Sequence, residues 1–183
     1  EAFSYLCTAA ITKGKIKIDK INPKYLHTEL QVLKKIGCNL KIKNSSIEID
    51  VKKKLKPIKI ITGPFPKFAT DNMPPLMAVL TKADGKSEIH ETIFSNRFQA
   101  VPELKRMGAS ISIKKNKATI IGQDKLYAAE CISSDLRTTF SIILGAIAAS
   151  GVSIIHRVYH GFRGYYNLDK KLKKIGIDIK KVS

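Results

Sequence analysis

One short motif occurs three times in the chain: a leucine, two basic residues, an apolar residue and a glycine. The copies lie at residues 33–37, 104–108 and 172–176. Each copy is followed by alternating apolar and polar residues, typical of a strand, and preceded by a more apolar segment that ends near Gly14, Gly85 or Gly151. Glycine just past a helix end is a common left-handed cap. Because the interval between the paired glycines hardly varies, the sequence predicts one supersecondary unit used three times.

Each unit is predicted to contain an apolar helix, a strand, an amphipathic helix and one or two further strands. In the first unit these elements are residues 1–10, 15–18, 23–36, 38–43 and 46–51. In the second unit they are residues 71–80, 87–94, 98–107, 109–114 and 118–121. In the third unit they are residues 135–149, 152–158, 166–175 and a last strand, 177–182. Segments 63–68 and 159–165 contain glycine or proline and are predicted loops.

Apolar helices inside and amphipathic helices outside predict an α+β fold with pseudo-threefold order around a shared bundle of buried helices. We expect one domain over residues 1–183, with units at about 1–62, 63–132 and 133–183, the third of them truncated. The chain opens without a methionine, inside a predicted helix. We therefore expect it to be a fragment of a longer protein.

The helix predicted at residues 135–149 is the most apolar element of the chain. Ser134 or Asp135 can cap its first turn, and after Arg137 no charged residue follows before His156. A helix without a polar face must be buried on all sides. It is too short to span a bilayer, which needs roughly 20 apolar residues.

The charge balance permits a polyanion partner without requiring one. The net charge is +18, and lysine supplies most of the basic residues. The lysines are scattered, which is usual for a solvated surface, but a lysine-rich nucleic-acid-binding module stays an alternative. Cys7, Cys38 and Cys131 have no ligand spacing. Cys7 and Cys131 lie in apolar sequence, where a free thiol acts as a small hydrophobe. With no secretory signal, this fits the reducing cytoplasm. We predict no metal site and no cofactor.

Arginine is the informative basic residue here because the chain otherwise prefers lysine. Arg97, Arg137 and Arg163 each lie at the end of a predicted element, where scaffolds usually carry functional side chains. A guanidinium can hold a carboxylate or phosphate with two parallel hydrogen bonds, so three such ends favour a shared anion site. Each arginine could instead anchor its own loop or pair with a neighbouring acid. Asp71 and Asp135 open equivalent helices, and helix capping alone accounts for both; a role as general base is the alternative.

Several motifs resemble those of the enolpyruvyl transferases, and most closely the branch that acts on UDP-N-acetylglucosamine. They are Thr70–Asp71 and residues 91–98, 102–109, 135–137 and 159–165. The resemblance covers the whole chain. It implies a fold of βαβαββ units around inward-facing helices, an inside-out α/β barrel, of which this chain would be the second of two domains.

The resemblance also implies an activity: transfer of an enolpyruvyl group from phosphoenolpyruvate to the 3-hydroxyl of UDP-N-acetylglucosamine, the first committed step of peptidoglycan synthesis. Asp71 matches the residue that holds the sugar hydroxyl and acts as its base. Arg137 and Arg163 match residues that bind phosphoenolpyruvate, and Ile93 matches a backbone contact to the nucleotide sugar. Asp135 would lie in the same cluster as these arginines, and Phe94 and Arg97 would line the cleft.

The chain departs from the family pattern near the implied site. Phe162 and Tyr166 stand where the family usually has acids, Met73 and Pro75 where it has glutamines, and residues 3–4 where it has Gly-Thr. The first domain, with the loop that carries the proton donor, is not in this sequence, so we expect the chain to be inactive alone. That domain would come from the same polypeptide or from a separate one. An inactive relic and the shikimate-pathway branch of the family are the alternatives.

Overall fold

The computed structural model describes residues 1–182. The helices are α1 (Ala2–Thr12), η1 (Pro23–Leu26), α2 (His27–Lys35), η2 (Thr70–Asn72), α3 (Met73–Leu80), α4 (Val101–Arg106), α5 (Leu136–Ala148), α6 (Tyr159–Phe162) and α7 (Leu168–Lys174), where η marks a 3-10 helix. The strands are β1 (Lys15–Asp19), β2 (Asn39–Lys43), β3 (Ser46–Asp50), β4 (Lys59–Ile61), β5 (Lys86–His90), β6 (Ser110–Lys114), β7 (Lys117–Ile121), β8 (Leu126–Tyr127), β9 (Glu130–Ile132), β10 (Ala149–Ser150) and β11 (Ile154–His156).

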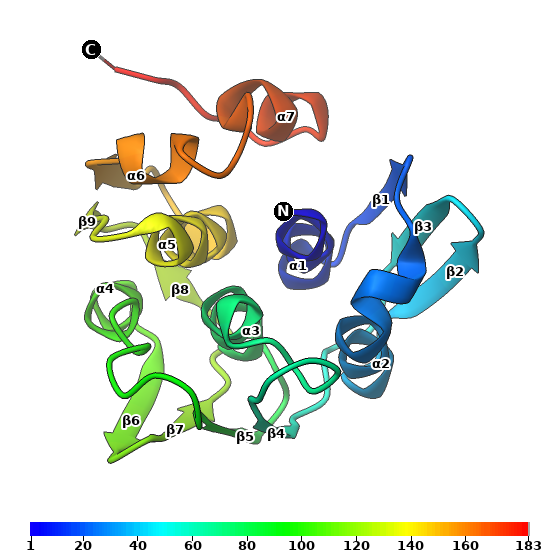
Figure 1. The fold of residues 1–183 in the computed structure, drawn as a ribbon. Helices are drawn as coiled ribbons and strands as arrows, with labels where there is room; N and C mark the ends of the chain where they lie inside the picture. Colours follow the sequence, from blue (N-terminus) through cyan, green and yellow to red (C-terminus); the bar gives the residue numbers. More distant parts are fainter. Residues whose placement is uncertain (183) are drawn as a thin grey trace.

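Three apolar helices, α1, α3 and α5, form the centre of the molecule. They pack on one another, and Figure 1 shows them together in the middle, with sheets around them and α2, α4 and α7 farther out. Every residue of α3 is buried, as are nine residues of α1 and eight of α5. This arrangement follows from their sequences, because helices without a polar face lower the free energy of the chain most by packing against each other. None of the helices described here is long and apolar enough to cross a membrane.

The sheets around this bundle differ in size. The first is antiparallel with the order β1-β3-β2, and the second has the order β4-β5-β7-β6, with β4 parallel to β5. The third side consists of two parallel pairs, β8 with β10 and β9 with β11. The structure has the predicted α+β architecture of repeated units around buried helices.

The helix ends confirm part of the glycine pattern. Gly37, Gly108 and Gly176 all have positive φ (100°, 88° and 89°) just past α2, α4 and α7. At this position a residue with a Cβ atom would be strained. The prediction was wrong at Gly14, because Lys13, with φ of 53°, takes the left-handed conformation at the end of α1.

Three predicted elements were wrong. The strand predicted at 87–94 ends at His90. Residues 91–94 form a loop in which the N–H groups of residues 92–94 are bonded to side chains instead of to a neighbouring strand. Residues 177–182 form no strand, since the third side contains no hairpin against which they could pair. The loop predicted at 159–165 contains the short helix α6. The other predicted elements are present with ends shifted by a few residues, and Ser183 lies outside the described residues.

Candidate active site

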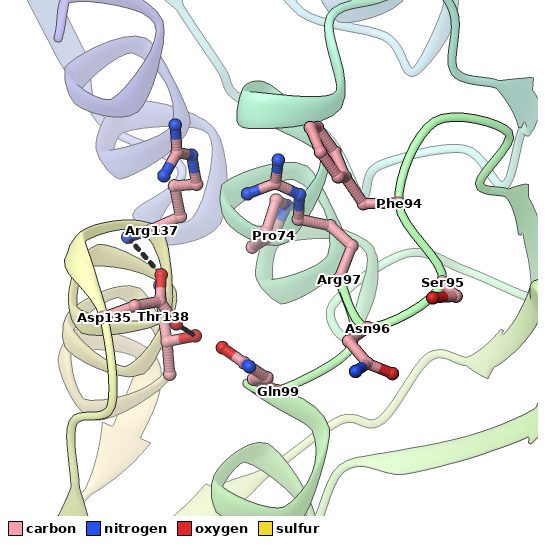
Figure 2. A pocket seen from close by; sticks show the side chains of 9 residues that line it. All are labelled: Pro74, Phe94, Ser95, Asn96, Arg97, Gln99, Asp135, Arg137 and Thr138. Carbon is pink, nitrogen blue, oxygen red and sulfur yellow. Dashed lines mark hydrogen bonds between the residues drawn. The ribbon is translucent and has the colours of Figure 1, made fainter.

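A pocket of about 520 Å³ opens where the first turns of α3 and α5 meet the loop that follows β5. Figure 2 shows the side chains around it. They are Pro74, Phe94, Ser95, Asn96, Arg97, Gln99, Asp135, Arg137 and Thr138. The pocket thus unites residues from the second and third repeats, which are distant in sequence.

Asp135 caps α5, as the sequence predicted. Its Oδ1 accepts hydrogen bonds from the backbone N–H groups of Arg137 (2.8 Å) and Thr138 (3.1 Å), and its Oδ2 accepts from the hydroxyl groups of Ser134 and Thr138. Burial alone would raise the pKa of Asp135, but these bonds outweigh burial and hold its pKa below the ordinary value. Asp135 is therefore ionised, and its carboxylate is engaged in capping the first turn of α5.

Replacing Asp135 with alanine should destabilise the fold by about 1 kcal/mol at neutral pH, because the first turn loses its acceptor. Since the folded-state pKa is depressed, the stabilisation is present above the unfolded-state pKa of about 4 and is lost as pH falls through the folded-state pKa. Urea unfolding of wild type and variant at a series of pH values measures this difference. Asp135→Asn keeps an accepting oxygen without a titrating group, so its advantage over D135A should not change with pH. A wild-type advantage over D135A that is constant from pH 7 to pH 2 would contradict the argument.

Asp71 does not cap a helix, so the capping prediction was wrong for this residue. It lies inside η2, whose N-cap is Ala69, and its side chain turns to two arginines. Arg137 donates to both carboxylate oxygens, from Nε to Oδ1 at 2.6 Å and from Nη2 to Oδ2 at 2.7 Å. Arg97 Nη2 lies 3.2 Å from Oδ1. This pairing joins the starts of α3 and α5, and it raises the pKa of Arg137 through its hydrogen bond to Asp71.

Arg97 is held on three sides. Its Nε donates to Thr70 Oγ1 at 3.2 Å, its Nη2 meets Asp71, and its guanidinium carbon lies 4.5 Å from the centre of the Phe94 ring. Figure 2 shows Arg97 and Phe94 side by side on the loop after β5. Only 13% of the Arg97 side chain is exposed. An arginine that is held in one orientation keeps less conformational freedom to lose when it binds an anion.

Two of the three predicted arginines therefore meet at one place and the third does not. Arg163 lies exposed at the end of α6, and neither it nor Ile93 is among the residues that line this pocket. The nearby Phe162 and Tyr166 are partly or largely exposed, and lysine ammonium groups lie within 6 Å of both rings.

Sequence reasoning missed two buried carboxylates beside the site. Glu91 follows β5 and is 1% exposed, and Glu29 lies in α2 and is 5% exposed. Glu29 Oε1 accepts hydrogen bonds from Ala69 N at 3.3 Å and from Asn72 Nδ2 at 3.1 Å, so it fixes the segment that carries Asp71. The only signal for Glu91 in the sequence was its place at the start of the motif at residues 91–98, just after a strand. Glu29 gave none, because an acid in the first turn of an amphipathic helix is common.

The cluster combines one carboxylate that can accept a proton with two guanidinium groups that can hold an anion. Among residues 1–182, no group of three or more His, Cys, Asp or Glu side chains is placed to hold a metal ion. The chemistry available to these residues is acid–base catalysis and electrostatic stabilisation.

A family model described as EPSP synthase (3-phosphoshikimate 1-carboxyvinyltransferase) matches residues 1–172. The chain belongs to the EPSP synthase family. A UDP-N-acetylglucosamine 1-carboxyvinyltransferase from Pelagibacter ubique is 49% identical over all 183 residues, and one from Campylobacter jejuni is 44% identical over 179 residues. The resemblance to the enolpyruvyl transferases is thus confirmed.

Solved structures of this family have the same fold as the chain. The enolpyruvyl transferase NikO from Streptomyces tendae matches 98% of the chain with a TM-score of 0.89 and 22% identity, and EPSP synthase from Acinetobacter baumannii matches 100% with a TM-score of 0.81 and 21% identity. The chain covers only 43% and 46% of these two structures. It likewise spans 44% and 43% of the two curated relatives, which is less than half of an EPSP synthase family protein.

Proposed function

We propose that this chain is the second domain of an enzyme that transfers the enolpyruvyl group of phosphoenolpyruvate to the 3-hydroxyl of UDP-N-acetylglucosamine. The enzyme would act in the cytoplasm, at the first committed step of peptidoglycan synthesis. The observation that carries the proposal is the convergence of Asp71, Arg137 and Arg97 beside one pocket, in a chain that shares 49% of its residues with an enzyme named for this substrate.

In the proposed reaction Asp71 takes the proton of the 3-hydroxyl while the sugar oxygen bonds to C2 of phosphoenolpyruvate. C3 of phosphoenolpyruvate gains a proton from a donor that we assign to the first domain. The tetrahedral intermediate then loses a C3 proton and inorganic phosphate to give the enol ether. Arg137 donates one hydrogen bond to each oxygen of Asp71, so the lone pairs that face Arg137 are occupied while this pairing lasts. An anionic substrate that takes over Arg137 would release Asp71, so substrate binding and activation of the base would be linked.

The remaining predicted residues are proposed to bind substrate. Arg163, together with Arg137, would hold phosphoenolpyruvate, which requires the exposed Arg163 side chain to close over the pocket. The Ile93 backbone would contact the nucleotide sugar, and Phe94, Arg97 and Asp135 would line the cleft. We propose that the chain is inactive without the first domain, supplied by the same or another polypeptide.

The lysine excess gives no support to the nucleic-acid alternative. On the first sheet Lys15 lies 3.0 Å from Glu48, and on the second Lys59 and Lys86 lie 3.4 Å and 2.9 Å from Glu88. Glu48 belongs to the middle strand, between the strands that carry Lys17 and Lys41. Acids interleaved with lysines in this way are typical of a solvated sheet face.

The proposal is tested by mixing the chain with the part of the Pelagibacter relative that the chain does not match, and by measuring phosphate release. We expect release that requires both phosphoenolpyruvate and UDP-N-acetylglucosamine, and none from either polypeptide alone. Release with shikimate 3-phosphate in place of the nucleotide sugar would instead favour the other branch of the family. A correctly folded mixture that binds neither substrate would favour the inactive relic.

A further inference from the structure

Glu91 is a buried carboxylate that lies beside the candidate site without lining its pocket. It is 1% exposed, and the structure gives each of its oxygens hydrogen-bond donors. Oε1 accepts from the backbone N–H groups of Ile93 at 2.7 Å and Phe94 at 3.1 Å, and Oε2 accepts from Thr70 Oγ1 at 2.8 Å. A buried carboxylate is costly to keep charged unless donors surround it. These three donors come from two separate segments, so Glu91 ties the loop after β5 to η2.

The bond between Glu91 and Thr70 has a fixed direction. Thr70 Oγ1 accepts a hydrogen bond from Arg97 Nε, and a hydroxyl has a single proton to donate. That proton goes to Glu91 Oε2, because the carboxylate has none to give. The result is a one-way chain from Arg97 through Thr70 to Glu91, in which the final negative charge makes the hydroxyl a better acceptor for the guanidinium.

Glu91 also helps to place the Phe94 ring, over which the Arg97 guanidinium lies. The Phe94 ring beneath the guanidinium belongs to a residue whose backbone N–H is bonded to Glu91. Glu91 thus governs two of the three contacts that hold Arg97, the hydrogen bond to Thr70 and the stacking on Phe94. The third contact is with Asp71.

We propose that Glu91 is a positioning residue that orients the Arg97 guanidinium toward the anionic part of the substrate. This inference rests on the proposed function, in which Arg97 lines the substrate cleft. Glu91 acts only through Thr70 and the loop backbone, and does not touch the substrate.

Glu91→Gln is the sharpest substitution because glutamine has nearly the same size. Its amide oxygen can still accept from the Ile93 and Phe94 N–H groups, but its –NH₂ group donates and cannot accept the Thr70 proton. Thr70→Val breaks the same chain from the other end, and Thr70→Ser keeps the hydroxyl. Glu29→Gln is a matched control, because both donors to Glu29 meet the same oxygen, which an amide oxygen can replace.

The readout is the exchange rate of the Arg97 Nε–H proton, measured by NMR on the 183-residue chain with ¹⁵N-labelled arginine. We expect exchange about tenfold faster in E91Q and in T70V, as for loss of one buried hydrogen bond to a charged group. T70S and E29Q should keep a rate near wild type. The double variant E91Q/T70V should exchange no faster than either single variant, because both break one chain.

Unchanged Arg97 exchange in a folded T70V or E91Q would overturn the proposal. If E91Q fails to fold, Glu91→Asp decides in its place, because the shorter carboxylate keeps its charge but is expected to lose either the loop N–H groups or Thr70, and unchanged Arg97 exchange in a folded E91D would overturn the proposal. In the reconstituted enzyme, E91Q and T70V should each raise the KM of one substrate about tenfold. T70S should keep that KM near the wild-type value. If wild type shows no turnover with either nucleotide sugar or shikimate 3-phosphate, the proposed function fails, and the NMR measurement still decides whether Glu91 orients Arg97.

Discussion

Replacing Asp71 with asparagine is expected to lower the turnover number of the reconstituted enzyme by a factor of about 10² to 10⁴, the usual contribution of a general base. Asparagine has the size of aspartate but cannot take up the hydroxyl proton. The same change removes the carboxylate that pairs with Arg137 and Arg97. Because two guanidinium groups then lose their internal counterion, the affinity for phosphoenolpyruvate should rise while turnover falls.

Steady-state phosphate release gives the turnover number, and isothermal titration of the variant with phosphoenolpyruvate gives the affinity. Asp124→Asn is a suitable control, because this exposed acid pairs with Lys54 outside the pocket and its loss should change neither quantity. If D71N keeps the wild-type turnover number, Asp71 is not the base. If turnover falls and affinity falls with it, the pairing with Arg137 organises the anion site instead of competing with the substrate.

Replacing Phe140 with alanine should destabilise the chain by about 3–5 kcal/mol, the usual cost of removing a large ring from a packed core. Phe140 is fully buried in α5, stacks on Tyr165 with ring centres 4.6 Å apart, and meets Tyr5 edge-on at 5.6 Å. Tyr165 is in turn hydrogen-bonded to Ser4 at 2.8 Å. The ring therefore joins α5 to α1 and to the segment before α7, and its loss leaves a cavity among all three.

The measurement is the free energy of unfolding from urea titration followed by circular dichroism. Phe65→Ala serves as the matched control, because Phe65 is 82% exposed and its removal should change stability by no more than about 0.5 kcal/mol. A loss below about 1 kcal/mol in F140A would mean that α1 and α5 are held together by other contacts.

The fold could be predicted from the sequence because its determinants are local. The glycine caps at Gly37 and Gly108 depend on backbone conformation within one turn. The burial of α5 follows from the absence of charged residues after Arg137. The repetition also predicted the central bundle, because three equivalent apolar helices bury their surfaces by packing against one another.

The site was less predictable because its geometry depends on distant residues. Asp71 and Asp135 look alike in the sequence, each at the start of an apolar helix. One caps its helix, and the other is drawn to Arg137 across 66 positions of sequence. No local pattern distinguishes them, because the choice depends on how α3 and α5 pack. Residue type singled out Arg97 and Arg137, which both pair with Asp71, but it did not single out the buried Glu91 that orients Arg97.

The three sides of the molecule differ in how firmly they are closed. The first two sides have sheets with five-residue antiparallel ladders, and the third has only the pairs β8–β10 and β9–β11, with two and three residues in register. Local opening of a folded protein begins where few backbone hydrogen bonds must break together. Opening of this chain should therefore start on its third side, while the β1-β3-β2 sheet stays closed until the whole chain unfolds. Since α6 and Arg163 follow β11 in the chain, the arginine that we propose closes over the pocket belongs to the side that opens most easily.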